Sequence, residues 1–309
     1  MGKKFLLCTA AVVGVIAISP DLQKELKDKS QQVYWMIMEN IRTETNETTS
    51  RLGVSEENDE MYYYRSQLSV KDQDTYDQIL EGIQGHDPSI KVSDTDTQKV
   101  SDITKEVLYD HPELFWVDAQ EFEVQTQRSL IGYSNVYMTY PYSAKEAEAM
   151  QTEIDAAADV ILGKVAQQTD TYDKIKTAYD SMIELVDYDI DAPDSQTIYS
   201  VFAAKKSVCA GYARSFQYLM QKSGIPCMTV FGDAGGDPHA WDIVSLDGTY
   251  YYVDPTWGDP VFLNDNGEEV KDVHDIYYDY FLCGSKKIDQ THTADPDMML
   301  PACSVEDFV

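Results

Sequence analysis

The sequence predicts an α+β fold with helices packed on antiparallel strands, and three observations lead to this prediction. Stretches with apolar residues every three or four positions open at capping residues such as Ser143 and Asp170, which is typical of helices. Two runs rich in aromatic and β-branched residues, 239–246 and 249–257, are joined by Asp-Gly, a strong hairpin signal. A shorter unit with mixed helical and strand patterns precedes them, so we expect more than one domain in 309 residues.

Composition excludes several classes of function. The formal net charge is -30, from 54 acidic and 24 basic residues, and such a surface repels nucleic-acid backbones and anionic lipid. Hydrophobic residues make up 43% of the chain, enough for a core and against global disorder. The acidity favours solubility, with attraction of cationic substrates such as lysine-rich peptides as the alternative.

The N-terminus has the pattern of an export signal. A basic start is followed by residues 5–18, an uncharged run of 14 residues that includes Cys8. A helix of that length spans only about 21 Å, less than the roughly 30 Å of a hydrocarbon core. We therefore expect residues 1–19 to be a signal peptide cleaved after Ala17, or else a short uncleaved anchor. Either predicts an extracellular protein, secreted or tethered to the membrane by this segment alone.

Three further regions follow the signal. Residues 20–60 are polar and predict a tether, and residues 61–142 predict a small mixed α and β domain whose first helix is capped by Ser69. Residues 143–309 hold the long helices and the hairpin. Because every chemically informative motif lies in this last part, we expect it to fold and act without the N-terminal third.

Cys209 is the candidate nucleophile. Residues 207–224 predict a helix, with Ser207 as the N-cap and Gly224 just past the C-terminus. Cys209 then lies in the first turn, where free N–H groups and the helix dipole favour a thiolate and can stabilise an oxyanion. A buried structural cysteine is the alternative for this position taken alone.

The hairpin predicts partners for that cysteine. With a two-residue Asp-Gly loop, Leu246 pairs with Thr249 and Trp241 lies opposite Asp254. His239 and Asp254 are then diagonal neighbours on one face, about 7 to 8 Å apart at the backbone, so their side chains can meet. A carboxylate there orients an imidazole and holds its tautomer. Taken singly, His239 could be a core histidine and Asp254 a turn residue.

The remaining chemistry-bearing residues predict no second site. Cys227 and Cys283 lie in apolar, strand-like runs and, with Cys303, are interpreted as buried hydrophobic side chains, although one disulfide among them stays open. No paired ligand spacing predicts a metal site, and the acidic turn at Asp265 lacks the later ligands of a calcium loop. We expect no cofactor and no metal.

The motifs VCAGYARSFQYLM, GIPCMTVFG and HAWDIVSLDGTYYYVDPTWGDP, in this order, closely resemble the core domain of the transglutaminase-like superfamily over roughly residues 171–300. The resemblance implies a papain-like α+β fold, a cysteine helix packed on an antiparallel sheet. It also implies that Cys209 is the nucleophile, His239 the base and Asp254 its orienter. Bacterial members often carry a mixed domain ahead of this core.

The family usually has asparagine where this chain has Asp242, so the pH behaviour of the triad is in question. Gln196 or Tyr199 is a candidate to assist the oxyanion, and Trp241 and Trp257 are expected to pack beside the site.

The resemblance implies an exported cysteine-dependent amide hydrolase or acyltransferase, working on peptide or protein amides through a thioester. The family includes proteases, transglutaminases and amidases, and we favour hydrolysis because nothing in the sequence predicts a site that excludes water. The alternative is a non-catalytic binding or structural module on the same scaffold. The expected partner is a peptide or protein substrate at the cell surface, and no oligomeric state is predicted.

Overall fold

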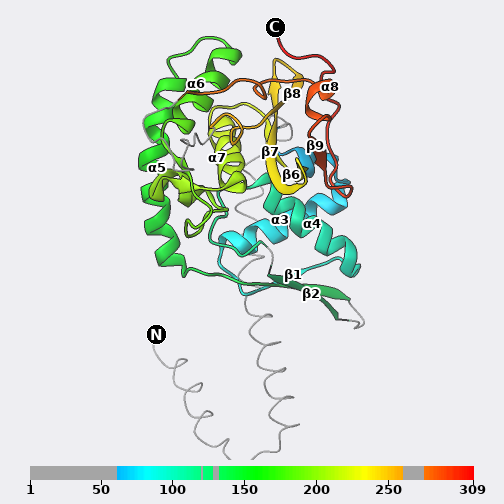
Figure 1. Ribbon diagram of the computed structural model, residues 1–309. Helices are drawn as coiled ribbons and strands as arrows, with labels where there is room; N and C mark the ends of the chain where they lie inside the picture. Colours follow the sequence, from blue (N-terminus) through cyan, green and yellow to red (C-terminus); the bar gives the residue numbers. More distant parts are fainter. Residues whose placement is uncertain (1–60, 120, 128–131, 260–274) are drawn as a thin grey trace, which may run out of the picture. The chain divides into compact units, whose positions relative to one another are not determined.

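The structure is a computed structural model that describes residues 61–119, 121–127, 132–259 and 275–309 (Figure 1). The predicted signal or anchor at 1–19, the tether at 20–60 and the turn at Asp265 lie outside the described residues. The described residues all belong to one compact unit. Within the described part, no helix is both long and apolar enough to cross a bilayer.

The N-terminal part of this unit is mixed, as predicted. Its helices and strands are α2 (Tyr63–Gln67), α3 (Val70–Gln84), β1 (Ser89–Val92), α4 (Thr97–Asp110), β2 (Phe122–Gln127) and β3 (Tyr133–Met138). The strands form an antiparallel sheet in the order β1-β3-β2. Ser69 caps α3 by accepting from the Asp72 N–H, which confirms that cap. Apolar faces of α3 and α4 and inward residues of the strands share one buried cluster.

The C-terminal part confirms the predicted α+β arrangement. Its elements are α5 (Ala144–Val165), α6 (Thr171–Ile183), β4 (Asp187–Tyr188), η2 (Ser200–Ala204), β5 (Lys206–Ser207), α7 (Cys209–Lys222), β6 (Cys227–Ala234), β7 (Asp237–Leu246), β8 (Thr249–Val253), α8 (Ser285–Ile288) and β9 (His292–Ala294). The long strands form an antiparallel sheet in the order β8-β7-β6-β9. Helix α5 begins with the predicted capping box of Ser143 and Glu146. The predicted strand around Cys283 is wrong, because Cys283 forms only an isolated bridge with Tyr252.

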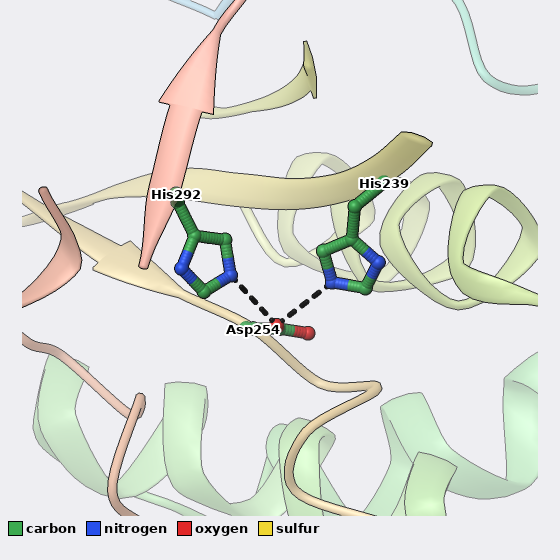
Figure 2. Close-up of side chains that lie close together, drawn as sticks. All are labelled: His239, Asp254 and His292. Carbon is green, nitrogen blue, oxygen red and sulfur yellow. Dashed lines mark hydrogen bonds and ion pairs between the residues drawn. The ribbon is translucent and has the colours of Figure 1, made fainter. Parts of the chain in front are cut away.

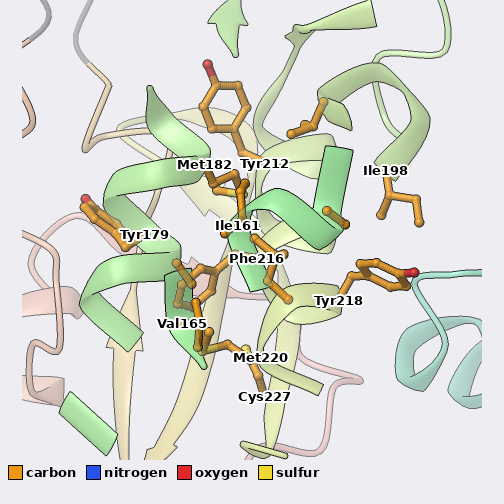
Figure 3. Packing of buried hydrophobic residues seen from close by; sticks show 14 of the residues in the cluster. Ile161, Val165, Tyr179, Met182, Ile198, Tyr212, Phe216, Tyr218, Met220 and Cys227 are labelled. Atoms are coloured by element: carbon orange, nitrogen blue, oxygen red, sulfur yellow. The ribbon is translucent and has the colours of Figure 1, made fainter. Parts of the chain in front are cut away.

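Helix α7 packs between the other long helices and the sheet. Figure 3 shows Phe216 of α7 among Ile161 and Val165 of α5 and Tyr179 and Met182 of α6. On its other side α7 contacts β6 and β7. Because helices pack on one side of α7 and strands on the other, the position of its N-terminal turn is fixed.

Several contacts cross the predicted boundary between residues 142 and 143. The Tyr64 ring of α2 is only 2% exposed and shares a buried cluster with Val230, Trp241 and Ile243 of the sheet. Gln217 of α7 donates to the carbonyl of Tyr109 across 2.8 Å. A fragment of residues 143–309 would lose these contacts. Its independent folding stays a prediction.

Candidate active site

Cys209 is the first residue of α7, in the turn where backbone N–H groups have no intrahelical acceptor. The N-cap is Val208 and not Ser207, so that expectation is wrong by one residue. Ser207 is the last residue of β5 instead, and its hydroxyl donates to the carbonyl of Ser195 at 2.8 Å. Gly211 permits this packing, since a Cβ there would lie 2.0 Å from the Ser207 oxygen.

The hairpin has the predicted register. Asp247 and Gly248 have φ of 50° and 85°, as a two-residue turn with two left-handed positions requires, and Leu246 pairs with Thr249. His239 and Asp254 consequently meet on one face, with Nε2 of His239 2.9 Å from Oδ2 of Asp254 (Figure 2). The carboxylate is an acceptor, so Nε2 carries the proton and Nδ1 is the ring nitrogen left for Cys209.

Asp254 is completely buried, yet all of its hydrogen-bonding capacity is used. Oδ1 accepts from the backbone N–H groups of Thr256 at 2.9 Å and Trp257 at 3.1 Å. Oδ2 accepts from His239 and from a second histidine, His292, at 3.1 Å. Burial acts to raise the pKa of Asp254, but the hydrogen bonds from the two histidines and Trp257 outweigh it and lower that pKa below 3.8. The site therefore holds an ionised carboxylate that is fully buried.

His239 lies between Asp254 and Cys209. Burial acts to lower the pKa of His239, but side-chain hydrogen bonds with Asp254 and Cys209 outweigh this effect and raise it from 6.5 to about 9. The imidazole is therefore positively charged at neutral pH. A cation beside a thiol stabilises the thiolate, so the three side chains have the relationship of a nucleophile, its acid–base partner and an orienting carboxylate.

His292 is a site residue that sequence reasoning missed. It is the first residue of β9, only 4% exposed, and Nδ1 lies 2.8 Å from the hydroxyl of Thr291. Figure 2 shows its ring on the opposite side of Asp254 from His239. A three-residue strand carries little periodicity, and the separation of 38 residues from Asp254 leaves no local signal.

The aromatic residues predicted to pack beside the site do so. The Trp241 ring lies 6.2 Å from His239 and 4.9 Å from His292, and the Trp257 ring lies 5.9 Å and 4.6 Å from the same two rings. Gly232 of β6 makes room for Trp241, since a Cβ there would lie 2.9 Å from the indole and 2.2 Å from the carbonyl of Thr293. These rings pack around the histidine pair and bury His292.

Tyr199 and Gln196, the two candidates to stabilise the oxyanion, lie in different surroundings. The Tyr199 hydroxyl donates to Glu153 of α5 at 3.0 Å, and its ring stacks on Phe115, so the structure does not bring it to Cys209. Gln196 is exposed in the segment before η2. Sequence reasoning did not select Tyr188 of β4, which lies near Cys209. Burial raises the pKa of Tyr188, and the charge of a Cys209 thiolate raises it further.

Asp242 faces away from the triad and is fully buried. The Gln217 Nε2 donates to the Tyr109 carbonyl at 2.8 Å, which turns Oε1 toward Thr229, and the Thr229 hydroxyl donates to it at 3.0 Å. The single hydroxyl proton of Thr229 is used in the bond to Gln217. The Thr229 oxygen is 3.3 Å from Oδ1 of Asp242, so the proton between these two atoms has to come from Asp242, which is then a neutral acid. Burial, together with the Asp254 charge, raises the pKa of Asp242 well above 3.8. A neutral Asp242 takes the part of the asparagine usual in the family.

The ligand atoms of His239, Asp254 and His292 lie within 4.8 Å of one another, a spacing that a divalent metal ion could bridge. Sequence spacing carried no sign of this group. Both Nε2 protons already point at Asp254 Oδ2, so a metal ion would have to displace both. The group as it stands satisfies itself by hydrogen bonding.

The four cysteines of the described residues are unpaired. Burial raises the pKa of Cys283 to about 12 and that of Cys303 to about 11, and it raises the pKa of Cys227 well above 9. These three thiols stay protonated at neutral pH, and none lies at the start of a long helix.

A helix that begins with cysteine, packed on an antiparallel sheet that carries a histidine–aspartate pair, defines a papain-like α+β fold. Residues 158–255 match the family described as the transglutaminase-like superfamily. The chain therefore carries a domain of the transglutaminase-like superfamily, as the sequence motifs predicted.

Two curated relatives align with part of this chain. Kyphoscoliosis peptidase of Mus musculus is 24% identical over 131 residues, covering 37% of this chain and 20% of that protein. The Homo sapiens protein of the same name is 27% identical over 128 residues, covering 36% of this chain and 19% of that protein. The chain thus spans about a fifth of the length of the curated relatives it matches.

Two solved structures are also similar. The crystal structure of a TGase aligns with a TM-score of 0.35 and 16% identity, over 49% of this chain and 47% of that chain. The periplasmic domain of TgpA from Pseudomonas aeruginosa, bound to ethylmercury, aligns with a TM-score of 0.29 and 16% identity, over 43% of this chain and 65% of that chain.

Proposed function

We propose that this protein is an exported cysteine-dependent enzyme that cleaves or transfers peptide or protein amides, with Cys209 as nucleophile, His239 as acid–base and Asp254 as orienter. The observation that carries the proposal is the position of His239, which is hydrogen-bonded to Asp254 and lies near enough to Cys209 for that side chain to affect the His239 pKa. Membership in the superfamily and the names of the peptidase relatives support amide chemistry.

In the proposed reaction, Cys209 Sγ attacks the amide carbonyl carbon, and first-turn N–H groups of α7 stabilise the oxyanion. His239 gives its proton to the leaving amine as the C–N bond breaks, which leaves a thioester. Water, or a primary amine, then attacks the thioester while His239 takes a proton from the attacking group, and the C–S bond breaks to release Cys209 as a thiolate. Water yields hydrolysis and an amine yields transfer.

Hydrolysis is the favoured outcome. Cys209 is half-buried rather than enclosed, and the acidic surface suits cationic peptide substrates. Export rests on the pattern of residues 1–19.

The decisive experiment is a profile of peptide and glutamine-type amides, run with and without a primary amine. We expect a thioester on Cys209 that mass spectrometry detects, and product release by water. The matched control is Cys209→Ser, which keeps the shape of the site with a much weaker nucleophile. A folded wild-type protein that neither turns over any amide nor captures an electrophilic amide probe on Cys209 would be a binding module, and the proposal would be wrong.

A further inference from the structure

His292 is a buried histidine that the three-residue triad does not require. Its Nε2 lies 3.1 Å from Asp254 Oδ2, and its Nδ1 lies 2.8 Å from the hydroxyl of Thr291. The Thr291 hydroxyl is itself 3.1 Å from the hydroxyl of Tyr280. Both ring nitrogens therefore have partners, which sets the orientation of the ring.

The direction of these bonds follows from the groups involved. Asp254 is ionised and can only accept, so His292 donates from Nε2 to Oδ2. The Thr291 hydroxyl can serve Nδ1 as either donor or acceptor. The rings of Trp241, Trp257 and Tyr280, with centroids 4.9, 4.6 and 5.2 Å from that of His292, enclose the imidazole and exclude water that could replace it.

The same carboxylate oxygen accepts from both histidines. Oδ1 accepts hydrogen bonds from the backbone N–H groups of Thr256 and Trp257. Oδ2, in contrast, accepts hydrogen bonds only from side chains among the described residues. Without His292, Oδ2 would meet His239 on one side and apolar rings on the other. A buried carboxylate with an unused acceptor is costly, and the group would rotate or take up a proton.

We propose that His292 is a positioning residue: by donating to Asp254 Oδ2 it fixes the carboxylate in the orientation that holds the His239 ring against Cys209. The inference rests on the proposed function and adds a fourth side chain to it. His292 touches no reacting atom and acts through Asp254.

The test uses the rate at which iodoacetamide alkylates Cys209 in the full chain, followed by mass spectrometry, because this rate needs no known substrate. His292→Leu removes the donor and keeps an apolar side chain, and we expect the rate to fall by about 10- to 100-fold. His292→Gln places an amide N–H where Nε2 lies, and we expect a rate within about 3-fold of wild type. Thr291→Val leaves the histidine but frees Nδ1, and we expect a fall of about 3- to 10-fold.

Two results would overturn the inference. One is a folded His292→Leu protein that reacts at the wild-type rate. The other is a His292→Gln protein as slow as His292→Leu, since the donor would then not matter. If His292→Leu does not fold by near-ultraviolet circular dichroism, a wild-type rate in Thr291→Val overturns it. Failure of the proposed triad looks different, because wild type would then react no faster than His239→Ala.

Discussion

Asp254 and His292 approach to 3.1 Å although they belong to opposite edges of the four-stranded sheet. Asp254 directly follows edge strand β8, and His292 opens edge strand β9. Strand twist, and the turn of the chain after Val253, bring these edges together. His239 of β7 is the third member of the group. The polar atoms of the three side chains meet in a buried space, where electrostatic interactions are strong.

Asp254→Asn is predicted to abolish activity while keeping most of the fold. The amide oxygen can still accept from Thr256 and Trp257, but the amide N–H₂ would face the two histidine donors and force His239 into the wrong tautomer. We expect turnover to fall on the order of 10³- to 10⁴-fold. Asp254→Ala should also lower the free energy of unfolding by about 3 to 5 kcal/mol, because it removes one partner of a buried ion pair and leaves the N–H groups of His239 and His292 without an acceptor. Near-normal turnover in Asp254→Asn would contradict this assignment.

The charge on His239 predicts an alkaline limit to activity. Hydrogen bonds with Asp254 and Cys209 outweigh burial and raise the His239 pKa to about 9, and the imidazolium is the acid that protonates the leaving amine. Turnover should therefore fall as pH rises through about 9. A pH–rate profile that still climbs at about pH 10 would show that this proton is not needed.

The same pKa affects stability with a definite sign. The folded state binds the His239 proton more tightly than the unfolded state, so its contribution is complete below pH 6.5 and is lost as pH rises through about 9. The slope is at most about 1.4 kcal/mol per pH unit. Urea unfolding between these pH values measures it, and His239→Gln, which cannot titrate, should remove this part of the slope.

Asp242→Asn is predicted to stabilise the protein increasingly with pH. The unfolded chain loses the Asp242 proton near its ordinary pKa of 3.8, whereas the folded state keeps it, because burial first and the Asp254 charge also raise that pKa. Stability is therefore lost as pH rises above about 4, by up to about 1.4 kcal/mol per pH unit, until the folded-state pKa is reached. An asparagine can donate to Thr229 without this cost.

Chemical denaturation of wild type and Asp242→Asn at several pH values tests this prediction. The two proteins should be equal near pH 4 and diverge above it. A constant difference at all pH values would mean that Asp242 is ionised in the folded state, contrary to the hydrogen-bond directions.

Cys209 is predicted to be the one thiol of the described residues that iodoacetamide labels quickly at pH 6. Burial raises the pKa of Cys283 to about 12 and that of Cys303 to about 11, and Cys227 is also fully buried, so these thiols are protonated and shielded. Peptide mapping after brief labelling measures the order, with unfolded protein as the control in which all cysteines react. Faster labelling of Cys227, Cys283 or Cys303 would contradict the assignment.

Tyr64 is predicted to tie the N-terminal part to the catalytic sheet. Tyr64→Ala should lower the free energy of unfolding by about 3 to 5 kcal/mol, since the ring fills a buried cluster with Val230, Trp241 and Ile243. Tyr64→Phe is the matched control and should be neutral or stabilising, because the buried hydroxyl has no hydrogen-bond partner.

A fragment of residues 143–309 loses this ring entirely, along with the Tyr109 carbonyl that Gln217 uses. It should unfold at a lower temperature than residues 61–309 and expose apolar sheet surface. Equal melting temperatures would restore the expectation of an independent catalytic part.

The sequence by itself determined the features that depend on neighbouring residues. The caps at Ser69, Ser143 and Asp170 and the turn at Asp247 and Gly248 are local, because the groups that form each hydrogen bond lie within a few positions. The hairpin register follows from the turn, so the meeting of His239 with Asp254 could be predicted once the loop length was known. The position of Cys209 at the start of α7 followed from helical periodicity in the same way.

Only the tertiary structure decided the contacts that join distant segments. His292 reaches Asp254 across 38 residues, and Gln217 reaches Tyr109 across 108. Such pairs are set by how the sheet twists and by which buried donors and acceptors find partners, and no local periodicity encodes either. The neutral state of Asp242 depends on the direction of each bond in the line from Tyr109 through Gln217 and Thr229, a property of the packed interior that its sequence neighbours do not reveal.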